Sequence, residues 1–125
     1  MREGKVVTKR TDVTSKDQVD DLFATTAREL GPVDVLVSCA GVMYFTMMAT
    51  AQIDEWSTTV DVNGKRLLNC LSATAPDMLS RYSSHQVPRK IITISSDAGR
   101  KVFPGLGVYS ASKFFAEATL QALRL

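Results

Sequence analysis

The chain has 125 residues, of which 45% are hydrophobic and 22% are charged. This composition is typical of globular proteins and excludes the disordered, fibrous and disulfide-rich classes. Fifteen Lys and Arg stand against thirteen Asp and Glu, and the formal net charge is +2. Such a balance excludes the basic field that binds nucleic acid or an anionic membrane. We therefore expect neither partner, and we expect residues 1–125 to belong to one domain.

Two cysteines, Cys39 and Cys70, are far apart in the sequence and show neither CxxC spacing nor a nearby histidine cluster. The pattern predicts no metal site and no disulfide, and favours reduced thiols in a cytoplasmic protein. The longest stretch without a charged residue, 35–53, is interrupted by polar residues and glycine, which argues against a membrane span. Residues 1–14 lack the apolar run of a signal peptide.

Short apolar runs alternate with segments of helical period, an order that predicts an α/β fold with a parallel sheet. A weak strand is expected over 5–10. Ser15 and Gln18 then form a capping box, and Gly31 with Pro32 predicts that the helix ends near Leu30. One apolar stripe runs along this helix, formed by Val19, Leu22, Phe23, Ala27 and Leu30.

Residues 33–39 read VDVLVSC, a nearly continuous apolar run that predicts a strand buried on both faces. The run ends in Ala40 and Gly41. Small residues at the carboxyl end of a parallel strand let a ligand approach the backbone, and ligands of open α/β sheets bind at that edge.

A second helix is expected over 54–80, with a kink at Pro76. Residues 81–90 are polar and predict a surface connection, in which we expect His85 to be solvated rather than catalytic. A third strand is expected over 91–95, followed by a loop over 96–107 and a helix from Tyr109 to the end of the chain.

The last helix opens with YSASK, which places Tyr109 and Lys113 four residues apart and on one face. An ammonium group beside a phenol favours the phenolate, so Tyr109 could exchange a proton with a substrate oxygen as a general acid or base. On its own the spacing fits equally well an ordinary exposed helical pair.

The surroundings make the pattern specific. The segments ISSDAG (94–99), FPG (103–105) and YSASK (109–113) resemble the catalytic segment of the short-chain dehydrogenase/reductase family. SCAG at 38–41 resembles that family's NNAG turn, DVN at 61–63 resembles its catalytic asparagine segment, and DVT at 12–14 resembles its adenine-contacting turn. These six segments occur in the family's order, and all 125 residues align with it. The resemblance implies part of a Rossmann-like, doubly wound parallel sheet, with three strands and their flanking helices.

The resemblance implies a role for each of four residues. Tyr109 would be the catalytic acid or base, and Lys113 would promote its ionisation and hold the nicotinamide ribose. Ser96 would orient the substrate carbonyl. Asn63 would support a water chain that relays protons to Lys113, although it could instead be a buried asparagine that ties its helix to a neighbouring strand.

The family resemblance also implies a cofactor, NADP or NAD. Asp12 and Val13 would contact the adenine, although an Asp before a helix is commonly only a capping residue. Cys39, Ala40 and Gly41 match the cofactor turn, to which Tyr109 and Lys113 add their contacts. Two departures stand out. Ser38 and Cys39 replace two asparagines that usually brace neighbouring strands, and Arg66 stands where the family commonly has glycine, which could alter helix packing.

The function implied by the resemblance is hydride transfer between NAD(P)(H) and a small alcohol or carbonyl compound, such as a secondary alcohol or hydroxy acid. Loops at 43–47 and 103–105 would border the substrate pocket. The family's glycine-rich turn for the pyrophosphate has no counterpart before Lys5, and the alignment stops inside the helix of Tyr109. We therefore expect the 125 residues alone to be inactive. The alternative is a truncated, non-catalytic fragment that self-associates or pairs with a complete subunit.

The helices of 54–80 and of Tyr109 resemble the pair that forms subunit interfaces in the family. Their apolar side chains exceed what one sheet face could cover, which predicts a homodimer or homotetramer. The residues concerned are Leu67, Leu71, Met78, Phe114, Phe115, Ala118 and Leu120.

Overall fold

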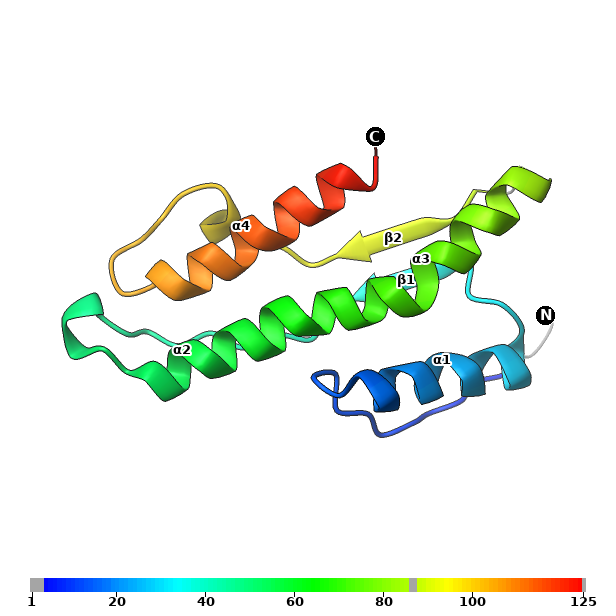
Figure 1. Cartoon of the computed structure of the whole chain (residues 1–125), viewed down its shortest axis with the longest axis horizontal. Coiled ribbons are helices and arrows are strands. Elements are labelled where there is room, and N and C mark those ends of the chain that lie inside the picture. Colours follow the sequence, from blue (N-terminus) through cyan, green and yellow to red (C-terminus); the bar gives the residue numbers. More distant parts are fainter. Residues whose placement is uncertain (1–3, 86–87, 125) are drawn as a thin grey trace.

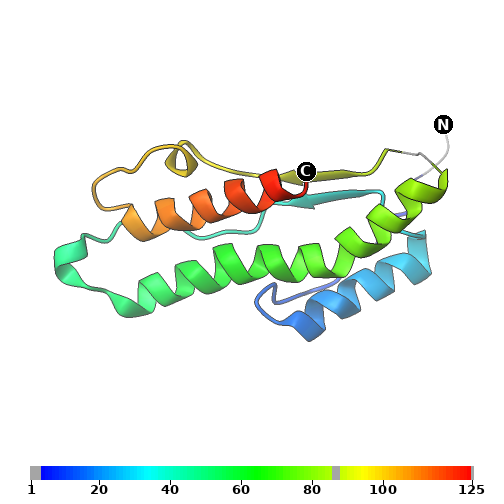
Figure 2. The ribbon, with the colours of Figure 1, turned by 45° about the horizontal axis from the view of Figure 1, so that its top comes forward.

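A computed structural model of the chain describes residues 4–85 and 88–124. Its helices lie along one side of a two-stranded parallel sheet (Figures 1 and 2), which confirms the predicted α/β class. In chain order the elements are α1 (Lys16–Leu30), β1 (Val35–Ser38), η1 (Met48–Thr50), α2 (Ile53–Thr59), η2 (Val60–Lys65), α3 (Arg66–His85), β2 (Lys90–Thr93), η3 (Asp97–Gly99) and α4 (Gly107–Ala122). None of these described helices has the length and apolar character needed to cross a membrane.

Helix α1 begins and ends where its capping residues predict. The Ser15 hydroxyl accepts a hydrogen bond from the Gln18 N–H, and Gly31 ends the helix with φ of 96°, a conformation that favours glycine. The second half of the capping box differs from expectation. The Gln18 side chain accepts its hydrogen bond from the N–H of Asp12, at 2.8 Å, rather than from that of Ser15.

The predicted strand over 5–10 is wrong. These residues run back along α1 without pairing to the sheet (Figure 1). Lys5 Nζ donates to the carboxylate of Glu29 at 2.9 Å, and Lys9 Nζ donates to Thr25 Oγ1 at 3.1 Å. A strand needs a neighbouring strand for its backbone groups, and here the lysines bind the helix surface instead. The sheet of the described residues therefore has two strands rather than three.

The two strands of the sheet pair in parallel, with Leu36 opposite Ile91 and Val37 opposite Ile92. Leu36 is buried beneath the helices, whereas Val37 and Ile92 are exposed on the opposite face. The expectation that β1 is buried on both faces is thus wrong for this chain, because its helices cover one face only (Figure 2).

A continuous helical run from α2 through η2 to α3 covers the whole of the helix predicted over 54–80 and extends beyond it. It contains a π-helical turn, η2, that the sequence pattern did not predict, and Pro76 lies inside α3 without ending it. The helix continues to His85, so the first half of the predicted connection over 81–90 is wrong. Arg81 explains the extension, because its guanidinium binds both Asp77, one turn earlier, and Asp34, next to β1. The side chain of His85 lies outside the described part of the structure.

The core lies between the covered sheet face and the helices. One buried cluster joins Val19, Leu36, Cys70 and Met78, and a second joins Leu67, Leu71 and Ala116. Leu67, Leu71 and Met78 are therefore core residues and not the surplus surface that we expected. Phe114, Phe115 and Ala118 of the expected set are exposed on α4.

Candidate active site

Asn63 is the most enclosed of the candidate residues, with 1% of its surface exposed. It lies in the π-helical turn η2 and points at the loop that follows β1. Its Oδ1 accepts a hydrogen bond from Val42 N at 2.8 Å, and its Nδ2 donates to Val42 O at 2.9 Å. The side chain thereby ties the helix to the segment next to the Cys39–Ala40–Gly41 turn, as the structural alternative for this residue predicts.

A further hydrogen bond connects Asn63 to the helix that carries Tyr109. Nδ2 of Asn63 donates to Ser112 Oγ at 3.0 Å, and Ser112 Oγ donates to the carbonyl oxygen of Tyr109 at 2.7 Å. Ser112 is buried, and nothing in the sequence motif singled it out. The signal that could have found it is its position three residues after Tyr109, from which a helical serine can bond back to the preceding turn.

Tyr109 and Lys113 share one face of α4. The Lys113 ammonium lies 5.7 Å from the centre of the Tyr109 ring, and it donates to the carbonyl oxygen of Ile94 at 3.0 Å. Lys113 is buried, while Tyr109 is half-buried. The bond to Ile94 anchors α4 to the carboxyl end of β2 and uses one of the three donors of the ammonium group.

Ser96 follows β2 and caps the short helix η3, where its Oγ accepts from the Ala98 N–H at 3.1 Å. The hydroxyl hydrogen remains able to donate to another acceptor. Helix η3 packs against α4 at Gly99. A Cβ on Gly99 would lie 3.4 Å from Cβ of Lys113 and 3.0 Å from Ser95 Oγ, so a side chain there would press on the helix of Tyr109.

The Cys39–Ala40–Gly41 turn is exposed beside this group. A Cβ on Gly41 would lie 3.3 Å from Oδ1 of Asn63, so glycine permits the close approach. Cys70, the second cysteine, is buried in α3, and burial raises the pKa of its thiol although Arg66 opposes the effect.

Arg66 and Ser38 form a buried pair behind the turn. The guanidinium, only 2% exposed, donates through Nη1 to Ser38 Oγ. Burial lowers the pKa of Arg66, and its Nε has no hydrogen-bond partner in the described part of the chain. Ser38 and Arg66, two residues that depart from the family pattern, therefore bond to each other. Arg66 stabilises the end of β1, where the sequence suggested that bracing is lost.

Asp12 and Val13 lie at the start of α1. Oδ1 of Asp12 accepts from the Thr14 hydroxyl at 2.7 Å and from the Thr14 N–H at 2.9 Å, and these bonds lower the pKa of the carboxyl. The Val13 carbonyl accepts from Asn69 Nδ2 at 3.0 Å. The contacts of Asp12 stabilise the turn that precedes the Ser15 cap of α1, and Val13 connects this turn to α3.

The two loops that were expected to border a substrate are joined to each other. Thr46 N donates to Gly105 O at 2.8 Å, and the ring of Phe45 lies so close to Gly105 that a Cβ there would be 2.4 Å from it. Gly105 also has φ of 76°, which favours glycine. Lys101 covers the ring of Phe103 at 4.9 Å. Both loops leave the carboxyl ends of the two strands, as predicted.

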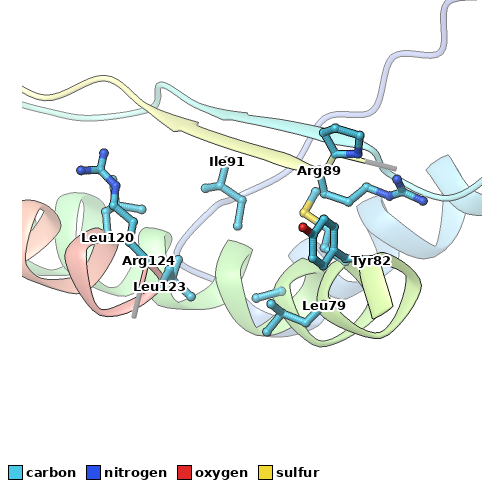
Figure 3. A pocket seen from close by; sticks show the side chains of 10 residues that line it. Leu79, Tyr82, Arg89, Ile91, Leu120, Leu123 and Arg124 are labelled. Carbon is cyan, nitrogen blue, oxygen red and sulfur yellow. The ribbon is translucent and has the colours of Figure 1, made fainter. Parts of the chain in front are cut away.

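A cavity of about 410 Å³ lies elsewhere, between α3, the start of β2 and the end of α4 (Figure 3). Its walls are mainly apolar and include Met78, Tyr82, Ile91 and Leu123. None of the candidate site residues lines it. Because the cavity lies at the amino end of β2, whereas ligands of open α/β sheets bind at the carboxyl end, the candidate site remains the group around Tyr109.

The grouping of Tyr109, Lys113, Ser96 and Asn63 can be compared with known proteins. The sequence profile of the family described as short chain dehydrogenase matches residues 1–125. The chain belongs to the short-chain dehydrogenase family. This membership confirms the family resemblance and the partial Rossmann-like fold that it implied, apart from the strand over 5–10.

Among similar members of the family, glycine betaine reductase ATRR of Emericella nidulans is 66% identical over 121 residues, which are 97% of this chain and 9% of that protein. A short-chain dehydrogenase/reductase from Burkholderia phymatum, solved with NAD, is 26% identical with a TM-score of 0.85, over 94% of this chain and 40% of that one. The closed form of serine dehydrogenase with NADP+ is 30% identical with a TM-score of 0.81, over 91% and 44%. The chain thus spans less than half of each.

Proposed function

We propose that this chain supplies the catalytic half of an NAD(P)-dependent oxidoreductase domain that acts on a small alcohol or carbonyl compound, a secondary alcohol or hydroxy acid. The observation that carries the proposal is the buried Lys113 ammonium 5.7 Å from the ring of Tyr109, at the carboxyl end of the sheet. Membership of the short-chain dehydrogenase family supports the same reaction class.

In carbonyl reduction, the Tyr109 phenol donates a proton to the substrate oxygen, and in alcohol oxidation the phenolate takes that proton back. The Ser96 hydroxyl donates a hydrogen bond to the same oxygen and so fixes its position. Lys113 places its positive charge beside the ring of Tyr109. The nicotinamide ring supplies or accepts the hydride when bound. Asn63 holds the loop of Val42 in place, and its role in a proton-relaying water chain is part of the proposal.

The residues present fit a nicotinamide cofactor. Cys39, Ala40 and Gly41 form an exposed turn of small side chains, and Lys113 keeps donors for a ribose hydroxyl after its bond to Ile94. Asp12 and Val13 would contact the adenine. Related structures contain NAD in one case and NADP+ in another. We favour NADP, with NAD as the alternative.

A cationic small substrate is the second candidate, because glycine betaine reductase is 66% identical to this chain. Tyr44 and Phe45 expose aromatic surface in the loop after β1. Aromatic faces attract quaternary ammonium groups, so this loop could recognise such a group while Tyr109 acts on a nearby carbonyl.

The whole enzyme is proposed to be a cytoplasmic homodimer or homotetramer that buries Phe114 and Phe115 of α4, which are exposed here.

The 125 residues alone are expected to be inactive, since they contain no glycine-rich turn at a helix N-terminus to receive a pyrophosphate. Calorimetry tests this expectation by measuring how tightly NADP binds the isolated chain. Micromolar affinity would indicate a self-sufficient enzyme and contradict the proposal. A non-catalytic fragment that only self-associates is the remaining alternative.

The proposed chemistry is tested in a polypeptide that supplies the whole domain. Tyr109→Phe removes only the phenol oxygen, so kcat should fall by about 10² to 10⁴ while cofactor binding is retained. Lys113→Ala should weaken both. Tyr82→Phe, at an exposed tyrosine of α3, is the matched control and should leave kcat unchanged. If Tyr109→Phe kept more than about a tenth of the parental kcat, the general-acid role would be abandoned.

A further inference from the structure

We propose that Ser112 is a positioning residue that fixes Tyr109 relative to the cofactor turn. Its hydroxyl is the link between Asn63 Nδ2, at 3.0 Å, and the Tyr109 carbonyl oxygen, at 2.7 Å. Asn63 in turn holds both backbone polar groups of Val42, which follows Gly41 directly. The inference rests on the proposed function of Tyr109.

The direction of each hydrogen bond is determined by chemistry. An amide nitrogen can only donate and a carbonyl oxygen can only accept, so between Asn63 Nδ2 and Tyr109 O the bridging group must accept on one side and donate on the other. A hydroxyl does both. Ser112 is buried, and water cannot readily replace the missing bonds if the hydroxyl is removed.

The link acts on the placement of the phenol. Ser112 holds the backbone of Tyr109 at the first turn of α4, where Leu106 precedes the helix without a side-chain cap. Lys113 is held separately through Ile94. Loss of the hydroxyl should therefore let Tyr109 shift relative to Lys113 and to the Gly41 turn, and misplacement of a reacting group costs rate rather than affinity.

The experiment compares Ser112→Ala with Ser110→Ala in the whole domain. Ser110 is also buried on α4, and its hydroxyl has no hydrogen-bond partner among the described residues. We expect Ser112→Ala to lower kcat by about tenfold and to leave KM for the cofactor within about twofold. Ser110→Ala should change neither.

A double-mutant cycle identifies the route. If Ser112 acts through Asn63, then Ser112→Ala should add little to the kcat loss of Asn63→Ala. Should Ser112→Ala fail to fold, Ser112→Thr and Ser112→Val give a comparison at equal volume, and only the threonine variant should retain the parental kcat. Helical threonine can bond the carbonyl three or four residues earlier.

Two results would overturn the inference. One is a Ser112→Ala enzyme whose kcat and KM match those of Ser110→Ala, even if its melting temperature falls. The other is equal behaviour of Ser112→Thr and Ser112→Val. Failure of the proposed function is recognised separately, because Tyr109→Phe would then retain activity.

Discussion

Asn63 and Val42 hold each other through two hydrogen bonds of opposite direction, so one amide side chain satisfies both backbone groups of a loop residue. This geometry resembles a short piece of sheet formed by a side chain. It fixes the loop after β1 against the π-helical turn, independently of any bound molecule.

Asn63→Ala should therefore destabilise the chain itself. The change leaves the partly buried Val42 N and O without their partners, and we expect a loss of about 2 kcal/mol in the free energy of unfolding. Urea unfolding followed by circular dichroism measures it. Thr59→Val is the control, since Thr59 bonds only to the carbonyl of Glu55 in its own helix. Equal losses in the two variants would contradict the bracing role.

Ser38 and Arg66 should show strong coupling in stability. Ser38→Ala removes the acceptor of a buried guanidinium and should cost about 2 kcal/mol, whereas Ser38→Ala with Arg66→Met removes the charge as well and should recover most of that loss. Thermal unfolding of the four proteins of the cycle measures the coupling. Lys65→Met, at an exposed neighbour paired with Asp61, should have almost no effect. A cycle that is additive would show that the two side chains act independently.

The two cysteines should differ in reactivity. Cys39 is exposed, whereas Cys70 is buried and its pKa is raised by that burial. The thiolate is the nucleophile, so a raised pKa leaves less of it at a given pH. Iodoacetamide should alkylate Cys39 in the folded chain and Cys70 only in urea, as read from peptide masses. A Cys39→Ser variant should be inert when folded. Equal alkylation of both cysteines without urea would count against this.

Asp12 should contribute to stability only where it is ionised. Its folded pKa is lowered by the Thr14 hydroxyl and then by the Thr14 N–H. A lowered pKa gives a contribution that is present above the unfolded value of about 4 and is lost as the pH falls through the folded value. Asp12→Asn should thus lower the urea midpoint near neutral pH and have progressively less effect as the pH falls through the folded pKa of Asp12. Thr14→Val should remove most of the difference between Asp and Asn, and a difference independent of pH would refute the explanation.

The uncovered sheet face should make the 125-residue chain self-associate. Val35, Val37, Ile92 and Ile94 are about half exposed on that face, and exposed apolar strands are aggregation sites. Light scattering should give a mass above 13.7 kDa, and Val37→Thr with Ile92→Thr should reduce it while keeping strand propensity. Val102→Thr, at an exposed loop residue, is the control. A stable monomer at high micromolar concentration would contradict the prediction.

Local signals predicted the parts of the fold that depend on local interactions. The Ser15 cap and Gly31 define α1, and the apolar runs define β1 and β2. The strand over 5–10 failed because a strand is completed by its partner, and the sequence of this segment does not specify one. In the structure its Lys5 and Lys9 instead form ion pairs with Glu29 and Asp21 of α1.

The candidate site could be proposed from the sequence where a motif contains its residues. Tyr109, Lys113 and Asn63 were identified from spacing and family resemblance, and the structure brings Asn63 to the helix of Tyr109 through Ser112. Ser112 and the Ser38–Arg66 bond were missed because each depends on residues distant in sequence. Arg66 carried a usable signal, since a cation at a core-facing helical position requires a polar partner opposite it.

The π-helical turn η2 rotates α3 about the helix axis relative to α2. Each residue of an α-helix turns the chain by about 100°, and a π turn holds one residue more than an α turn, so α3 is rotated relative to α2 by roughly that angle. This offset allows α2 to face α4 while α3 packs against α1 and β1 and, through Leu67 and Leu71, against Ala116 of α4. Deleting one residue from 60–65 would convert the π-helical hydrogen bonds to α-helical ones. It would also rotate Leu67 and Cys70 out of the core. The irregular turn is therefore an angular adjustment, and its length matters more than its helix propensity.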